Sequence, residues 1–292
     1  MTTYLILAFS MVACLLAVIL RKHCGSKFQN KSAMYHVYNA CESSVCMITL
    51  IAVSGNLKVS AFTMILGVVF GLITALGTFF TLKALDIGPL SYTSVITSMS
   101  TIISAISGYL FWDEDIALIQ LVGVALMLLC FVFSVDFAGE KKKASIRWFV
   151  YAMIAFFCTG FIGVMQKWHQ NTLFKDELDG FLIIAFVIST LYSLCMMLVE
   201  KKKTGKGVKE EINPLLIAFM IIAGICAAAN NKINLYLSGV MDSAIFFPVV
   251  NGGGLVLAAV ASHIIFKEKL SPKKRIGILI GIVAVLLLCN PF

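Results

Sequence analysis

The side chains that could do chemistry inside this sequence gather first around Glu42. Glu42 lies about nine residues into an apolar segment, with Asn39 on the same helical face and His36 beside it. An ionisable group in such a segment is costly to bury, so it marks a functional site by default. Glu42 would bind a proton or a cationic ligand; the alternative is a structural acid paired with Lys232.

A second set of polar side chains occurs near residue 232. Asn230 and Asn234 are one helical turn apart and could grip a polar ligand. If Lys232 faces a cavity, its ammonium favours an anionic or zwitterionic ligand; otherwise the long side chain extends to the membrane interface. All three residues are therefore candidate ligand contacts.

Two further segments could line a cavity or bend. Thr97 and Thr101 belong to a stripe of small polar residues at three-to-four spacing, which favours close helix packing or an aqueous wall. Asn251 lies in a segment that combines a proline with three glycines, a combination that weakens a helix. We expect Thr97, Thr101 and Asn251 to contact the ligand. The candidate hinge residues are Pro248, Gly252, Gly253 and Gly254.

The composition of the chain indicates that these residues lie in a membrane protein. Of the 292 residues, 60% are hydrophobic and 13% are charged, and the net charge is +8. So few charges cannot cover a soluble surface or a nucleic-acid-binding one, which excludes both classes. Ten apolar runs are long enough, at about 20 residues, to cross a bilayer as helices. They are residues 3–20, 33–54, 60–84, 89–111, 116–135, 147–168, 180–199, 214–237, 241–266 and 273–290.

The sequence gives little indication of disulfide bonds, metal binding or catalysis. The nine cysteines are scattered, mostly inside apolar runs, and are expected to be buried hydrophobes. No cluster has metal-ligand spacing and no catalytic motif occurs at membrane depth, so we expect no metal, no cofactor and no enzymatic activity. Two pairs of glycines four residues apart, Gly67 with Gly71 and Gly277 with Gly281, predict close helix packing.

The basic residues occur in alternate connections between the expected helices. The connections after the first, fifth, seventh and ninth spans hold 18 of the 23 lysines and arginines. The connections after the fourth and sixth spans carry acids instead, at residues 113–115 and 176–179. The positive-inside rule then places the odd-numbered connections in the cytosol and both termini outside.

The ten spans divide into two similar halves. Shifted by 154 residues, the third to fifth spans fall on the eighth to tenth without a gap, Glu114 on Glu268 and Gly123 on Gly277. A five-helix unit has an odd number of spans, so its copy would be inverted in the membrane. We predict an all-α integral membrane protein with ten transmembrane helices in two inverted five-helix repeats, residues 1–136 and 137–292.

An apolar helix that ends in a bulky residue and Glu114 or Glu268, followed by a helix with Gly123 or Gly277, resembles the EamA repeat. That repeat belongs to the drug/metabolite transporter superfamily. The resemblance covers about 3–135 and 147–290 and is strongest in the fourth, fifth, ninth and tenth spans; Pro248 fits the pattern and Ser94 departs from it. It implies a ten-helix bundle that exports or exchanges small metabolites by alternating access. Several relatives are described with cytosolic termini, the reverse of the orientation that the charges indicate.

These patterns predict a secondary-active exporter of small polar metabolites, amino acids or related compounds first, in a plasma membrane of the bacterial inner-membrane type. The alternatives are export of cationic or lipophilic compounds, and a lipid-linked-sugar flippase, which should show a lateral groove. The expected partners are the lipid bilayer, the small-molecule substrate and protons as the candidate coupling ion. We expect no nucleic-acid partner, and either a monomer or a homodimer.

Overall fold

The structure is a computed structural model that describes residues 2–25, 31–54, 57–135, 144–204, 214–265, 267 and 271–289. Within these ranges the regular structure is helical and includes no strand. Apolar segments become helices because a backbone in hydrocarbon must satisfy its own hydrogen bonds. The helices are α1 (Thr2–Gly25), α2 (Lys31–Val53), α3 (Ala61–Ile87), α4 (Leu90–Met99), α5 (Thr101–Phe111), α6 (Leu118–Phe133), α7 (Ile146–Gln170), η1 (Lys175–Glu177), α8 (Leu178–Thr204), α9 (Pro214–Val240), α10 (Ser243–Pro248), η3 (Val249–Gly253), α11 (Gly254–Ile265) and α12 (Pro272–Cys289).

Eight stretches of the described residues are long and apolar enough to cross a bilayer. They are α1, α2, α3, α4 with α5, α7, η1 with α8, α9, and α10 through α11. The other two expected spans coincide with α6, which has 16 residues, and α12, which begins with two lysines and an arginine after its proline. The prediction of an all-α chain is therefore confirmed for the described residues, and eight of its helical stretches are long and apolar enough to cross a membrane.

The outer surfaces of these helices are apolar. Leu5, Phe9, Leu118 and Leu286 are each more than 60% exposed. Exposure of so many large apolar side chains to water would be strongly unfavourable, whereas contact with lipid tails would not. The surface therefore agrees with a membrane environment.

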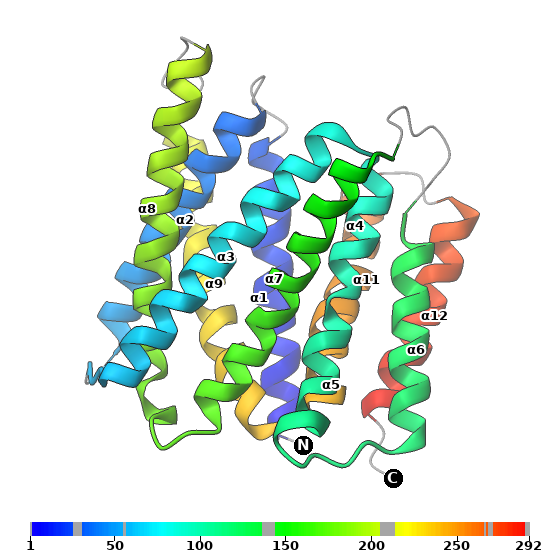
Figure 1. Cartoon of the computed structure of the whole chain (residues 1–292). Helices are drawn as coiled ribbons and strands as arrows, with labels where there is room; N and C mark the ends of the chain where they lie inside the picture. The colour runs from blue at the N-terminus through cyan, green and yellow to red at the C-terminus, as the bar shows by residue number, and fades with distance from the viewer. Residues whose placement is uncertain are drawn as a thin grey trace. The chain divides into compact units, whose positions relative to one another are not determined.

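One compact unit of the chain comprises Met1–Ala75 and Thr172–Tyr236. Within it, α2 and α8 pack along each other (Figure 1). α3 approaches α8 closely, because a Cβ added at Gly71 would lie 2.7 Å from the Cβ of Ile188 and one at Gly67 would lie 3.1 Å from the carbonyl oxygen of Phe181. The predicted packing role of this glycine pair is confirmed.

The other compact unit comprises Leu76–Asn171 and Leu237–Phe292. α6 and α12 lie side by side in it, and α5 packs against α7 and α10 (Figure 1). The contact between α6 and α12 is reciprocal. A Cβ at Gly123 of α6 would lie 2.7 Å from the Leu288 Cγ of α12, and one at Gly277 of α12 would lie 2.9 Å from the Phe133 Cβ of α6.

Each compact unit contains helices from both predicted halves, 1–136 and 137–292. The units describe which helices pack together, whereas the halves describe a duplication in the sequence. The two divisions are compatible, and the duplication stays a prediction at this point.

Candidate functional site

The predicted polar face of α2 lies in the interior of the first unit. Glu42 is buried, with 8% of its surface exposed. One turn before it, Asn39 Nδ2 donates to Ser189 Oγ of α8 at 3.3 Å and also to Ser193 Oγ. Ser43 Oγ lies 3.0 Å from Ser189 Oγ. A buried carboxylate, which can bind a proton, thus lies on the same helix as amide and hydroxyl groups that can bind a polar ligand.

His36, also on α2, is buried among aromatic rings. Its ring packs edge-on against Tyr35 and Tyr192, with centroids 5.6 and 6.1 Å apart. His36 Nδ1 has no hydrogen-bond partner among the residues that the structure describes. The predicted residue is therefore in the interior, but its observed contacts are with aromatic side chains.

Asn230 and Asn234 of α9 lie together as predicted, and a third residue joins them. Asn234 Nδ2 donates to Asn230 Oδ1 at 3.2 Å. Ser10 Oγ of α1 lies 2.9 Å from Asn230 Oδ1 and 2.6 Å from Asn234 Oδ1. One hydroxyl proton serves one acceptor at a time, so an amide oxygen keeps capacity for a ligand. Sequence reasoning missed Ser10 because a lone serine in an apolar helix gives no sign of its partner.

Lys232 pairs with Asp179 at the start of α8, which corrects the interpretation that it could neutralise Glu42. Lys232 Nζ lies 2.8 Å from Asp179 Oδ1 and 2.9 Å from Oδ2. The two side chains are 33% and 19% exposed. The partner was missed because Asp179 belongs to an acidic connection that the sequence assigns to solvent.

A cavity of about 500 Å³ in the first unit adjoins this ion pair. α2, α8 and α9 contribute its walls, which are almost entirely apolar. The lining residues include Leu50, Val53, Leu178, Ile225, Ile233 and Lys232. Such a volume falls within the range of about 300–1,000 Å³ that small-molecule sites occupy.

Two membrane-length helices of the second unit change their hydrogen-bonding pattern at one point, and the backbone beside that point keeps right-handed helical angles. α4 ends at Met99 and α5 begins at Thr101; between them, Ser100 N and Ser100 Oγ donate to the Thr97 carbonyl at 3.3 and 2.6 Å. The second irregular turn is the π-helical η3, which lies between α10 and α11. Local π geometry inside a helix frequently accompanies a functional site.

A hydrogen bond between Asn251 and Thr101 connects these two irregular turns. Asn251 Nδ2 of η3 donates to Thr101 Oγ1 at the start of α5, at 3.0 Å. Both residues were predicted as ligand contacts from separate segments, and the structure brings them together. Thr97 instead bonds the carbonyl of Thr93 in its own helix at 3.0 Å.

The residues predicted as a hinge surround η3. Pro248 is the last residue of α10. A Cβ at Gly252 would lie 1.9 Å from Met127 Sδ of α6, whereas one at Gly254 would meet nothing within 4 Å. Gly252 and its neighbour Gly253 are buried. The π-helical turn η3 thus lies where the sequence predicts a weak helix. That the helix bends at this turn stays a prediction.

The links that follow α5 and α11 share an uncommon backbone conformation. Asp113 and Lys267 are 154 residues apart and have φ angles of 51° and 52°; they are the described non-glycine residues with positive φ. This region is unfavourable for residues with a Cβ, so its recurrence at one sequence offset is informative. The same offset places Ser100 on Gly254. It places Glu114 on Glu268, which lies outside the described residues.

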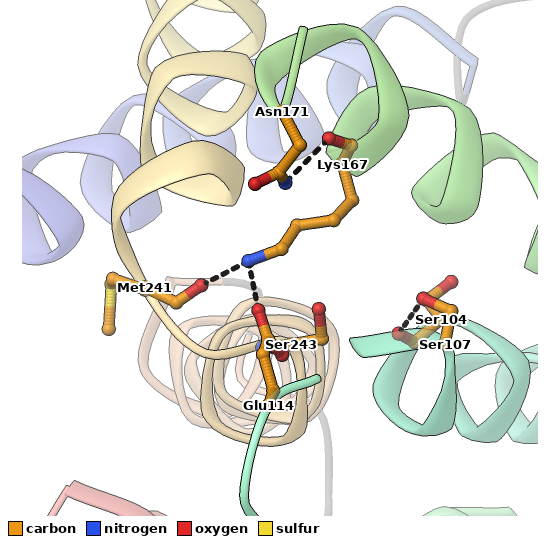
Figure 2. A network of polar contacts seen from close by, with 7 residues as sticks. All are labelled: Ser104, Ser107, Glu114, Lys167, Asn171, Met241 and Ser243. Atoms are coloured by element: carbon orange, nitrogen blue, oxygen red, sulfur yellow. Dashed lines mark hydrogen bonds and ion pairs between the residues drawn. The ribbon is translucent and has the colours of Figure 1, made fainter. Parts of the chain in front are cut away.

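A buried ion pair that the sequence did not reveal links three segments of the second unit (Figure 2). Lys167 of α7 is 3% exposed and contacts Glu114, which follows α5. Lys167 Nζ also donates to the Met241 carbonyl at 2.9 Å, and Glu114 Oε2 accepts from Ser243 N of α10 at 2.7 Å. The Lys167–Glu114 pair therefore ties the end of α7 to the links after α5 and α9.

Neighbouring groups extend this network. Asn171 Nδ2 donates to the Lys167 carbonyl at 2.9 Å (Figure 2). Ser104 Oγ of α5 donates to the Gly160 carbonyl of α7 at 2.8 Å, so these helices are in close contact. Asp242, between α9 and α10, has a pKa raised above 3.8 by partial burial and then by the Glu114 carboxylate; the Lys167 ammonium opposes the shift.

Comparison with known proteins finds a structure of similar fold but indicates no activity. No protein-family model matches the sequence, and no curated protein matches it. A solved structure described as "Crystal structure of protein" is 14% identical and covers 99% of this chain and 96% of its own, with a TM-score of 0.75. At that identity the likeness shows the fold alone. Among the described residues, no group of three or more His, Cys, Asp or Glu side chains could hold a metal ion.

Proposed function

We propose that the protein is a secondary-active transporter that moves small polar metabolites across a plasma membrane by alternating access. Amino acids and related zwitterions are the first substrate candidates, and export is the proposed direction. The protein would belong with the EamA-type members of the drug/metabolite transporter superfamily, and α6 and α12 would complete ten spans.

One observation carries this proposal: two membrane-length helices, each with an irregular turn, meet at the Asn251–Thr101 hydrogen bond. Interrupted helices in matching positions of two repeats are typical of the binding region of secondary transporters. The offset of 154 residues places Gly254, the residue directly after η3, on Ser100, where α4 gives way to α5. Irregular turns at equivalent positions would suit alternating access, because a helix can bend there without unfolding the rest of its span.

Further support comes from features that recur at the same offset. The positive φ angles of Asp113 and Lys267 and the reciprocal contacts of Gly123 and Gly277 relate the link and helix after α5 to those after α11. An inverted pair of repeats in a membrane protein favours a transporter over an enzyme or a structural protein.

The buried polar groups of the first unit suit a polar substrate and proton coupling. Glu42 is the candidate proton acceptor, and the hydroxyl and amide groups around Asn39 could exchange hydrogen bonds with a substrate. We expect a ligand that binds the native state to raise the melting temperature of the purified protein. A thermal-shift screen of the protein in lipid nanodiscs against the amino acids tests this: shifts that saturate with concentration support the proposal, and no shift with any amino acid contradicts the substrate class.

The apolar cavity favours a second candidate, the movement of lipophilic compounds or lipid-linked sugars. Its walls from α2, α8 and α9 could accept a hydrocarbon group. Adding long-chain amphiphiles to the thermal-shift screen separates the two candidates, because these amphiphiles and not amino acids would then stabilise the protein.

A further inference from the structure

We propose that His36 is a proton relay that passes protons between Glu42 and the end of the α2–α8 pair at which Glu200 lies. This inference rests on the proposed proton coupling through Glu42 and names the residue that supplies the proton. It assigns a role to a buried histidine whose observed contacts are aromatic rings.

His36 brings an unsatisfied polar atom into the contact between α2 and α8. Its side chain is 1% exposed, and its Nδ1 has no hydrogen-bond partner among the residues that the structure describes. The hydroxyl of Tyr192, whose ring lies 6.1 Å from the His36 ring, is also buried without a partner in the described part of the chain. Such atoms destabilise a fold, so their presence calls for an explanation. Both atoms are free to form transient hydrogen bonds.

Polar side chains continue from His36 toward the buried carboxylate of α2. Asn39 and Ser43 follow His36 at spacings of three and four residues, which places all three on one face of α2. On α8, Ser189 and Ser193 are one turn apart, and Asn39 Nδ2 donates to both of their oxygens. Ser43 Oγ lies 3.0 Å from Ser189 Oγ. Each hydroxyl can accept one proton while it donates another, so this face can carry protons along α2.

The outer end of this path lies at Glu200. Glu200 is the last residue of the membrane-length stretch that contains α8; it is partly exposed, and its carboxylate is close enough to act electrostatically on His36. The other titratable groups that face the His36 ring are the phenols of Tyr35 and Tyr192. A phenol keeps its proton at neutral pH, so Glu200 is the group that exchanges protons with the ring.

Imidazole suits the gap between the two carboxyl groups. Glu42 follows His36 by six residues, about 9 Å at 1.5 Å of helix rise per residue. A neutral imidazole has one N–H and one nitrogen lone pair. His36 would accept a proton on the free nitrogen and release the other proton from the opposite nitrogen, so the ring is neutral again after each transfer. Histidine does this readily because its unperturbed pKa is near neutral pH.

Infrared difference spectroscopy of the full-length protein in lipid nanodiscs tests the relay without a substrate. After a pH jump, the carboxyl band that is absent in Glu42→Gln reports the protonation of Glu42. We expect His36→Gln to slow this protonation at least tenfold and to keep the amplitude of the band. His263→Gln, which changes an exposed histidine of the other unit, should keep the wild-type rate.

Chemical rescue separates a relay from a structural role. His36→Ala should also protonate Glu42 slowly, and free imidazole added to the buffer should restore the rate at least fivefold, because it can occupy the space of the missing ring. Imidazole should not change the rate of the wild type. Equal protonation rates in His36→Gln and the wild type, no effect of imidazole on His36→Ala, or no Glu42 band in the wild type would each overturn the proposal.

Transport measurements distinguish this proposal from the proposed function. In proteoliposomes, His36→Gln should slow amino-acid uptake driven by a pH gradient at least tenfold and keep exchange within twofold, because exchange does not require Glu42 to release its proton. Slow protonation in His36→Gln without transport by the wild type would contradict the proposed function and leave the relay standing. Uptake by the wild type that depends on pH, with wild-type protonation of Glu42 in His36→Gln, would do the reverse.

Discussion

Lys167 and Glu114 form a buried ion pair, with side chains 4% and 13% exposed, between the end of α7 and the link after α5. The Lys167 ammonium also bonds the Met241 carbonyl, so one side chain holds two links in place. A pair with so little exposure is hard to break without moving the helices that carry it. In the proposed transporter this pair would either hold the second unit in one arrangement or open as the protein moves its substrate.

Loss of either member of the Lys167–Glu114 pair should lower the free energy of unfolding. Lys167→Met leaves the Glu114 carboxylate buried without its cation and should lower the unfolding free energy by about 3–5 kcal/mol. Glu114→Gln should also destabilise, because the Lys167 ammonium then loses its carboxylate. The double variant should recover most of the loss, since glutamine can still accept from Ser243 N.

Reversible unfolding in mixed micelles measures these effects as a double-mutant cycle. Asp113→Asn is the matched control, because Asp113 is the exposed neighbour of Glu114 and asparagine tolerates its positive φ. Single variants that lose no more stability than this control would show that the pair contributes little.

Asp242 gives a prediction about pH. Its raised pKa means that the folded state favours the protonated acid. The stability that protonation contributes is fully present below pH 3.8 and is lost as the pH rises through the raised pKa. Asp242→Asn removes this dependence and should melt at increasingly higher temperature than the wild type over that window, with no difference at the acidic end. Melting curves from pH 3.5 to 8 test the sign; a gap that is constant across the range argues against it.

A substitution at Gly254 tests whether the helix bends at η3. A methyl group at this position meets nothing within 4 Å, and alanine favours a helix over glycine by about 1 kcal/mol. Gly254→Ala should therefore keep or raise the melting temperature, keep ligand affinity within twofold, and slow substrate exchange several-fold by stiffening the start of α11 next to η3.

Gly252→Ala provides the contrast, because its methyl group would collide with Met127. Overpacking of this kind should cost about 1–3 kcal/mol of stability. If Gly254→Ala exchanges substrate at the wild-type rate, the segment is not a hinge.

A substitution at Glu42 tests whether this acid couples proton movement to transport. Glu42→Gln keeps the size of the side chain and removes the carboxylate that would carry the coupled proton, so uptake should lose its dependence on pH while the protein stays folded. Asp115→Asn, a change in an exposed carboxyl group outside the spans, should keep the wild-type pH dependence. Unchanged coupling in Glu42→Gln would assign this acid a structural role.

The helices could be predicted from the sequence because the apolar runs are long and the bilayer leaves the backbone few alternatives. Their observed ends lie within a few residues of the predicted ones, as α9 at Pro214–Val240 illustrates. The weak helix at Asn251 was also predictable, since proline and consecutive glycines act locally.

The partners of the buried charges could not be predicted in the same way. Asp179 for Lys232 and Lys167 for Glu114 are chosen by how helices pack, and one sequence does not specify that packing. The cavity had no sequence signal either, because its walls are ordinary apolar residues of three spans. The sequence therefore predicted several polar residues within the apolar helices, and the structure identified neighbours of these residues.

We propose above all that the two helices joined by Asn251 and Thr101 form the transport machinery of an amino-acid transporter. Exchange of radiolabelled amino acids in proteoliposomes tests it most directly, with Asn251→Ala and Thr101→Val against Asn231→Ala, whose amide bonds the Ala227 carbonyl of its own helix. We expect exchange by the wild type and the Asn231 variant, and at least a tenfold lower rate in the other two. Equal rates in all four proteins, or no exchange by the wild type above empty liposomes, would contradict the claim.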